Sequence, residues 1–294
     1  MIVPIIFALL SLAAFLISGL SVSFLVEELI FRLSRNLILV FSLIIPVITG
    51  LGLNFGIVLG AMAGQTGLIF IIAKKIPGIP GIFTAMLVAT PVAIVLGYFV
   101  GLVLNRAKGK EMITSMILGF FASGIYQLIY IVMAGSILPI GNKSILMPSG
   151  KGLKNTIDLI TIRKALDKAV FGEMFKTRIP VMTFLVIILI AVVMYYFMKT
   201  KMGQDMRAVG QSMHTAKIAG INVNRTRIIA VIISTVLAAW GQVIYLQNMG
   251  NLNTYTNHEN VGLFSVASLL IGGASVNKAT WQQALIGTIL FHTL

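Results

Sequence analysis

The chain of 294 residues contains no cysteine. Disulfide bonds, thiolate metal sites and cysteine nucleophiles are therefore excluded. Three histidines and eight acidic residues are few for a hydrolytic site, and no two histidines stand at the spacing of metal ligands. The sequence also lacks a Gly-x-x-x-x-Gly-Lys-Ser/Thr phosphate loop. These absences predict that the chain is not an enzyme, holds no metal or cofactor, and carries no ATP site of that kind.

Charged residues are scarce as well. They make up 10% of the chain, whereas 58% of its residues are hydrophobic, and a soluble domain carries about 25% charged residues. A chain with so few polar groups cannot cover a surface that faces water, so we predict an integral protein of a lipid bilayer. The net charge of +14 comes from short basic clusters between apolar runs. That placement favours anionic lipid headgroups and excludes nucleic acid as the expected partner.

Long runs without Asp, Glu, Lys or Arg predict the membrane segments. A spanning helix needs about 20 apolar residues, and such runs lie at 1–26, 36–73, 76–105, 112–142, 179–198, 228–258, 260–277 and 279–294. At about 1.5 Å per residue the second run is too long for one span, so it is expected to break into two. We predict an all-α, polytopic helical bundle of about eight or nine hydrophobic segments, including a broken glycine-rich segment.

Basic residues set the expected orientation. Segment 199–227 carries many basic residues and one acid, so the positive-inside rule places it in the cytoplasm. Counting spans back from it places loop 135–179 outside the cytoplasm, although that loop is itself basic. Apolar residues near helical spacing predict a short amphipathic helix over 158–174, which either lies on the membrane or docks an outside partner: Leu159, Ile162, Leu166, Ala169 and Met174.

The domain organisation is simple. No polar linker divides the sequence, so we expect a single transmembrane domain over residues 1–294. Its last apolar run, 279–294, is short for a span. This leaves two alternatives, a domain truncated at its C-terminus or a final segment that is only partly inserted.

Glycine recurs every four residues in the second run, at Gly52, Gly56, Gly60 and Gly64. On a helix these residues form one stripe, which lets a neighbouring helix approach closely. The same run holds two amides, Asn54 and Gln65. Glycine-interrupted segments with polar side chains near the midplane also build solute sites in transporters. Helix packing and a role in a translocation pathway are therefore both open for these amides.

A second set of uncharged polar residues lies toward the outer end of a later span. It consists of Gln242, Tyr245, Gln247 and Asn248. With Asn54 and Gln65, Gln242 completes the predicted solute pathway. Amides and a phenol suit a neutral, hydroxyl-rich solute better than an anion, although residues at a membrane interface also have this composition.

The cytoplasmic segment 199–227 contains an apolar stripe. Its members recur at intervals of four and three residues, which indicates one face of a short helix: Met202, Met206, Val209, Met213 and Ala216. Gly220 stands where a helix C-cap is expected. Gly210 weakens the middle of the helix, which favours close approach of another group to the backbone there. The helix either lies flat on the inner leaflet or fits a groove on a soluble partner.

The histidines, serines and acidic residues bear on two other possible functions, an enzyme and an ion-coupled transporter. His214 and His258 are expected in loops on opposite sides of the membrane, and Ser123 is expected to bond to its own helix backbone. Proton-coupled or sodium-coupled transport usually leaves an ionisable residue inside the bundle. All eight acids are expected in or beside loops, which argues against ion coupling. An ion-coupled secondary transporter of a small neutral solute is therefore kept only as the alternative hypothesis.

Three stretches carry a family resemblance. Residues 203–222 hold Arg207-Ala-Val-Gly210, then Gln-Ser, and finally Ala-Gly220-Ile. They resemble the cytoplasmic signature of ATP-binding-cassette permeases for simple sugars, nucleosides and branched-chain amino acids. Residues 111–118 resemble the start of a span in the sugar and nucleoside branch, and residues 270–274 resemble the late Gly-Gly segment of that family.

The resemblance implies a division of labour. The chain would be the permease subunit of an importer in a bacterial plasma membrane, carrying a small polar solute such as a simple sugar or nucleoside. It would pair with a second permease chain in a homodimer or heterodimer, with cytosolic ATP-binding subunits and with an extracytoplasmic solute-binding protein. Residues 199–227 would then hold the coupling helix, with these contact residues: Met206, Arg207, Gly210, Met213, Ala216 and Gly220. Sugar-type relatives often carry an acid in the second-span motif, whereas this chain has Asn54 there with no acid nearby, so their solute contacts are not transferred to this chain.

Overall fold

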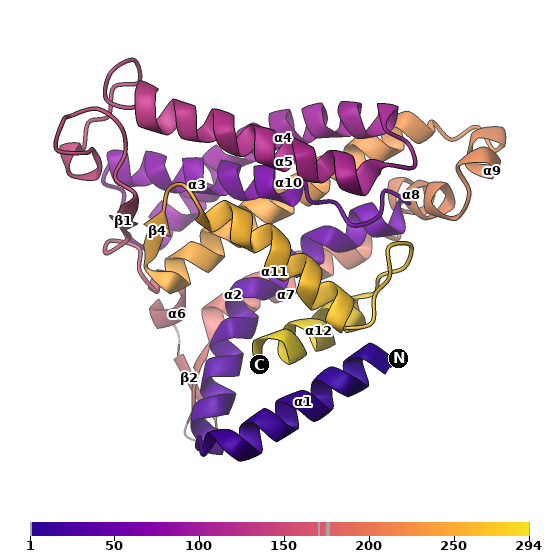
Figure 1. Cartoon of the computed structure of the whole chain (residues 1–294), viewed down its shortest axis with the longest axis horizontal. Coiled ribbons are helices and arrows are strands. Elements are labelled where there is room, and N and C mark those ends of the chain that lie inside the picture. Colours follow the sequence, from indigo (N-terminus) through magenta and orange to yellow (C-terminus); the bar gives the residue numbers. More distant parts are fainter. Residues whose placement is uncertain (1, 170, 175–176, 294) are drawn as a thin grey trace.

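The protein is predominantly helical. The computed structural model describes residues 2–169, 171–174 and 177–293 (Figure 1). The helices and strands are α1 Ile2–Ser18, α2 Val22–Ile48, α3 Ile57–Ala73, α4 Gly78–Arg106, α5 Glu111–Leu128 with a π-helical extension Ile129–Met133, a 3₁₀ turn Lys143–Ile145, β1 Thr156–Asp158, α6 Ala165–Ala169, β2 Phe171–Met174, β3 Thr177–Pro180, α7 Val181–Phe197, α8 Lys201–Gln211, α9 Met213–Ile218, α10 Val223–Met249, β4 Asn251–Asn253, α11 Asn257–Ile271 and α12 Trp281–Thr293.

Four of the described helices are long and apolar enough to cross a membrane, namely α2, α4, α5 with its extension, and α10. The count rises to five if α7 and α8, which meet at 74°, form one bent span. This is fewer than the eight or nine segments expected. Other apolar runs form shorter helices, such as α1 and α3 with 17 residues each. At 1.5 Å per residue these helices measure about 25 Å, somewhat less than the hydrocarbon core.

Helix α10 runs through the centre of the bundle and packs along α2, α3 and α4. Glycines allow this close packing. A methyl group on Gly60 would lie 2.4 Å from the carbonyl oxygen of Thr235, and one on Gly64 would lie 2.5 Å from that of Ala239. The small-residue stripe thus serves helix packing at these two positions.

The long second run is indeed broken, as predicted. Helix α2 ends at Ile48, and α3 begins only at Ile57. Gly50 and Gly52 have φ values of +75° and +71°, a left-handed conformation that glycine adopts without steric cost. The expected four-glycine stripe is therefore only half helical, because Gly52 and Gly56 both precede the start of α3.

Loop 135–179, which we call the outer loop after its predicted location, is held against the bundle by β-strand pairing. Strand β1 pairs antiparallel with β4, which follows α10. Leu159, Ile162 and Leu166 are buried as their spacing suggested, but the predicted helix over 158–174 is wrong. Only Ala165–Ala169 is helical, and β2 follows it. Turns that dock on α10 provide Leu159 and Ile162, and the short helix α6 provides Leu166, so the buried positions do not form one face of a continuous helix.

Loop 135–179 and segment 199–227 lie at opposite ends of the molecule. In Figure 1, β1 and β4 lie at the left end, whereas α8 and α9 lie at the right end. Helices α11 and α12 form a tight hairpin, and α1 lies beside α12. The sequence-based assignment of the α8–α9 end to the cytoplasm stays a prediction.

Candidate functional site

Asn54 lies in the break between α2 and α3. It is buried, and its Oδ1 accepts a hydrogen bond of 2.9 Å from the backbone N–H of Gly56. Its Nδ2 is buried without a hydrogen-bond partner among the described residues. The next residue, Phe55, donates its N–H to Ser115 near the start of α5. Asn54 therefore lies near the same end of the bundle as α8, and its role in a solute pathway stays a prediction.

Gln65 occupies the middle of α3 and belongs to a buried polar cluster. Its Oε1 lies 3.1 Å from Nδ1 of His258, whose Nε2 lies 3.1 Å from Oγ of Ser123. All three side chains are buried. The Nε2 of Gln65 donates a long hydrogen bond of 3.5 Å to the carbonyl oxygen of Asn253. We call Gln65, His258 and Ser123 the polar cluster.

The partners fix the proton positions within the polar cluster. An amide oxygen only accepts hydrogen bonds, so Nδ1 of His258 must carry the proton that it shares with Gln65. In a neutral imidazole Nε2 is then an acceptor, and the hydroxyl of Ser123 donates to it. The cluster thus forms a directed chain of hydrogen bonds from Ser123 through His258 to Gln65.

The polar cluster lies deep in the bundle. Ser123 is near the middle of the helical stretch 111–133, just as Gln65 is near the middle of α3. His258 is in the first turn of α11, so α11 begins well inside the bundle. The expectation of His258 in a loop is wrong, and Ser123 bonds to a partner helix and not to its own backbone. Sequence spacing gave no signal, because these contacts join residues 193 and 135 positions apart.

A pocket opens next to the polar cluster. It has a volume of about 140 Å³ and lies between α3, α5 and α11. Its walls are mostly apolar, with Ser123, Glu259 and Asn260 as polar members. Small-molecule sites measure about 300–1,000 Å³, so this pocket is smaller than such a site.

Gln242 is buried on α10 opposite Gly64. Neither its Oε1 nor its Nε2 has a hydrogen-bond partner within the described residues. The structure therefore does not join Gln242 or Asn54 by hydrogen bonds to the polar cluster, and each of the two is a separate amide with unused hydrogen-bonding capacity. Gln247 and Asn248, which the sequence analysis grouped with Gln242, both donate hydrogen bonds to Asp167 of the outer loop.

Tyr255 borders this region in the turn before α11. Its hydroxyl donates a hydrogen bond of 2.8 Å to the carbonyl oxygen of Leu153 in the outer loop. Burial raises the pKa of this hydroxyl above its ordinary value, because the phenolate is poorly solvated there. Tyr255 therefore stays neutral and ties the outer loop to the entry of α11.

Segment 199–227 forms two helices instead of one. Helix α8 ends at Gln211, and the hydroxyl of Ser212 caps α9 by accepting from the N–H of Thr215. Met206, Val209 and Ala216 of the apolar stripe are buried in the protein itself.

Gly210 lies near the end of α8 and not in the middle of a helix. A methyl group there would lie 1.9 Å from the carbonyl oxygen of Ile48. The close approach that we expected at Gly210 therefore exists, but it comes from α2 of the same chain. The exposed face of this segment carries other residues: Arg207, Met213, His214, Lys217, Ile218 and Gly220.

A buried ion pair connects this end of the bundle. Arg227 at the start of α10 pairs with Glu111 at the start of α5, and its side chain is fully buried. The Nη1 of Arg227 also contacts Sδ of Met213 in α9 at 3.1 Å. Buried acids thus exist in this chain at Glu111 and at Asp167, which the sequence analysis had placed in or beside loops.

Together these features define a polytopic helical membrane protein with a polar cluster at mid-depth and a basic, partly exposed segment at one end. The chain matches the family described as branched-chain amino acid transport system / permease component over residues 26–294. It belongs to this family, as the three resembling stretches predicted. The members of the family are permease components and not catalytic subunits.

Individual relatives are import permeases. The chain is 24% identical to the fructose import permease protein FruG of Bifidobacterium longum over 82% of this chain and 64% of the relative. It is 31% identical to the nucleoside ABC transporter permease protein NupC of Lactococcus lactis subsp. cremoris over 42% and 39%. For the galactose/methyl galactoside import permease protein MglC of Salmonella typhimurium the identity is 28% over 42% and 37%. The chain thus spans less than two thirds of each of these relatives. No solved structure matches it.

Proposed function

We propose that this protein is the permease subunit of an ATP-driven importer and that it forms the pathway for a small polar solute. The observation that carries the proposal is a mid-depth polar cluster in a chain whose relatives are import permeases. Buried polar groups in a membrane segment are costly and usually mark a solute pathway. Gln65 is the sequence-predicted pathway residue within this cluster. Gln242 lies against Gly64, next to Gln65 along α3, and Asn54 lies in the break before α3. The side-chain atoms of these two residues that have no partner among the described residues would add hydrogen bonds to the pathway.

The solute is proposed to be a simple sugar or a nucleoside. Its hydroxyl groups would exchange hydrogen bonds with Ser123, His258 and the amide side chains. A buried histidine also meets one requirement of ion-coupled transport, so the sequence argument against that alternative is weakened. Membership in the permease family favours ATP-driven import instead.

The partners follow from this assignment. Cytosolic ATP-binding subunits would contact the exposed face of α8 and α9, with Arg207, Met213 and Gly220 from the predicted coupling residues. Met206, Gly210 and Ala216 would support this face from within the protein. A second permease chain would complete the pathway, and a solute-binding protein would dock on the outer loop. The protein would be a multi-pass component of a bacterial cytoplasmic membrane.

Loss of the polar cluster is expected to reduce uptake. In His258→Leu, Oε1 of Gln65 and the hydroxyl of Ser123 both lose their partner. Leaving a buried polar atom unpaired costs about 1–3 kcal/mol, and each 1.4 kcal/mol corresponds to about a factor of ten. Uptake of radiolabelled fructose, galactose and uridine by cells expressing the whole transporter should therefore fall about tenfold for the transported solute. Ser123→Ala should act in the same direction, whereas Ser136→Ala alters an exposed serine and should have no effect. Unchanged uptake in both cluster variants would contradict the pathway assignment.

The exposed face of α9 is tested at Ile218, which is 76% exposed. An exposed apolar side chain in a basic segment suits the centre of an interface. Ile218→Asp should leave folding intact, yet weaken the association of ATP-binding subunits at least about tenfold, as each 1.4 kcal/mol lost is a factor of ten. Co-purification of those subunits with a tagged permease measures the effect. Ile160→Asp is the matched control, because Ile160 is 78% exposed in the outer loop. Equal recovery of subunits with both variants would remove α9 from the interface.

A further inference from the structure

Asp167 is a fully buried carboxylate in the outer loop. It lies in the short helix α6 and accepts hydrogen bonds from Thr183 of α7 at 2.6 Å, from Asn248 of α10 at 2.7 Å and, at 3.4 Å, from Gln247. A buried charge is tolerated only when it is well paired. The proposed solute pathway uses none of these contacts, which join α6 to two other helices, α7 and α10.

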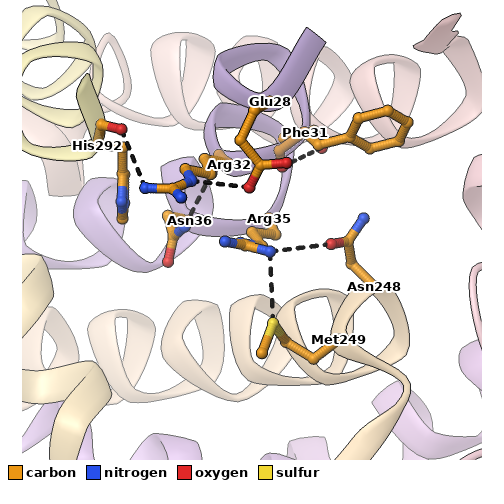
Figure 2. A network of polar contacts seen from close by, with 9 residues as sticks. Glu28, Phe31, Arg32, Arg35, Asn36, Asn248, Met249 and His292 are labelled. Carbon is orange, nitrogen blue, oxygen red and sulfur yellow. Dashed lines mark hydrogen bonds and ion pairs between the residues drawn. The ribbon is translucent and has the colours of Figure 1, made fainter. Parts of the chain in front are cut away.

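The chain of contacts continues through Asn248 to an arginine. Oδ1 of Asn248 accepts from Nη1 of Arg35 on α2 at 3.5 Å, as Figure 2 shows. The carboxylate of Glu28 on the same helix is bonded to Arg32 and not to Arg35. The two partners fix the orientation of the Asn248 amide, because a carboxylate only accepts and a guanidinium only donates. Asn248 therefore bridges a buried negative charge and a partly buried positive charge.

Backbone contacts join the same part of the outer loop to the same end of α10. The N–H of Lys164 donates to the carbonyl oxygen of Gln247 at 2.8 Å, and that of Leu159 donates to Gly250 at 3.0 Å. Gly250 ends α10 in a left-handed conformation, and the side chain of Arg163 lies directly against it. Together with the β1–β4 pairing, these bonds make residues 156–167 a clasp around the outer end of α10.

The opposite end of α10 holds the segment proposed to contact the ATP-binding subunits. There Arg227 pairs with Glu111 and touches Met213 of α9. Arg227 and Asn248 both belong to α10, so about 32 Å of continuous helix separates the two polar junctions. The glycines of α3 hold this helix tightly in the bundle. One rigid element thus has the outer-loop clasp at one end and α9 at the other.

We propose that the Asp167–Asn248–Arg35 junction locks the outer loop to α10, so that a protein docked on this loop acts on α10 and through it on the α8–α9 segment. Asp167 is thus a positioning residue that touches no solute. The inference rests on the proposed function for the identity of the docked partner, a solute-loaded binding protein. The lock itself is a property of this chain and can be tested without any partner.

Amide hydrogen exchange of the full-length purified protein tests the lock. Asp167→Asn removes the charge. Whichever way the new amide turns, its N–H₂ group replaces an accepting oxygen and faces either the donor on Asn248 or the donors on Thr183 and Gln247. We expect exchange of the N–H groups of Leu159 and Lys164 to become at least tenfold faster, while exchange within α3 and α4 is unchanged. Asp158→Asn is the matched control, since Asp158 lies in β1 of the same loop with an exposed side chain. It should leave all of these rates unchanged.

A double variant that moves the negative charge from residue 167 to residue 248 distinguishes loss of the lock from general misfolding. Asp167→Asn combined with Asn248→Asp puts the carboxylate on α10, where it accepts from the new amide and pairs directly with Arg35. This double variant should restore the slow exchange. Slow exchange in Asp167→Asn alone, or fast exchange in the double variant, would overturn the lock.

The functional arm uses the complete transporter in proteoliposomes. Asp167→Asn should abolish stimulation of ATP hydrolysis by the solute-loaded binding protein. Basal hydrolysis should stay within twofold of that of the unmodified transporter. The double variant Asp167→Asn, Asn248→Asp should restore the stimulation. If a variant with fast hydrogen exchange at Leu159 and Lys164 still shows full stimulation, the docked protein does not act on the α8–α9 segment through α10. If the unmodified transporter shows no ATP hydrolysis at all, the proposed function fails. The amide hydrogen-exchange measurement still tests the lock in that case.

Discussion

Arg227→Met is expected to lower the free energy of unfolding by about 3–5 kcal/mol, because it leaves the carboxylate of Glu111 buried without its cation. Arg227 is completely buried and Glu111 nearly so. Methionine fills a similar volume but cannot pair with the acid. The loss also removes the contact between α10 and Met213. Titration of the purified protein with a denaturing detergent, followed by circular dichroism, measures the change.

Two further variants isolate the cause. Arg225→Met removes an exposed arginine two residues away and should change stability by less than about 0.5 kcal/mol. Adding Glu111→Met to Arg227→Met removes the stranded carboxylate. Replacement of a whole buried ion pair by apolar residues is often neutral or stabilising, so this double variant should recover most of the loss. If the double variant is as unstable as Arg227→Met, an unpaired charge is not the reason.

The sequence predicted the features that depend on neighbouring residues. The break in run 36–73 followed from its length, and Gly50 and Gly52 provide its left-handed turns. The apolar stripe of segment 199–227 was real, since Met206, Val209 and Ala216 are buried. Its partner could not be deduced, because periodicity identifies an apolar face without saying what covers it. In the structure the rest of this chain covers it, and the exposed residues of α9 became the proposed contact.

Features that join distant residues escaped the sequence. His258 is near no other polar residue of its cluster along the chain, and only the packing of α11 against α3 and α5 unites them. The same holds for Asp167, whose partners on α10 are 80 and 81 positions away. In the outer loop the spacing of Leu159, Ile162 and Leu166 marked buried positions correctly. The N–H groups of Leu159 and Lys164 bond to carbonyl oxygens at the end of α10 instead of within a helix, as tertiary contacts commonly override local propensity.

Gly60→Leu is expected to cause the other large loss of stability. The side chain would start 2.4 Å from the carbonyl oxygen of Thr235 and 2.7 Å from Cβ of Ala238. Overpacking costs about 1–3 kcal/mol where side chains can adjust, and more where they cannot. Here the obstacle is the backbone of α10, so α3 and α10 must separate along their whole contact. We expect little monodisperse protein in size-exclusion chromatography and a clearly lower unfolding midpoint.

The control for this substitution is Gly124→Leu. Gly124 lies within α5, and a methyl group there meets no atom within 4 Å. Both changes replace a helical glycine by the same apolar residue, and both therefore gain helix propensity by a similar amount. Only the packing differs, so Gly124→Leu should leave the yield and the unfolding midpoint unchanged or slightly raised. Equal behaviour of the two variants would show that α3 and α10 are not in the close contact on which the position of the polar cluster and the α10 connection both depend.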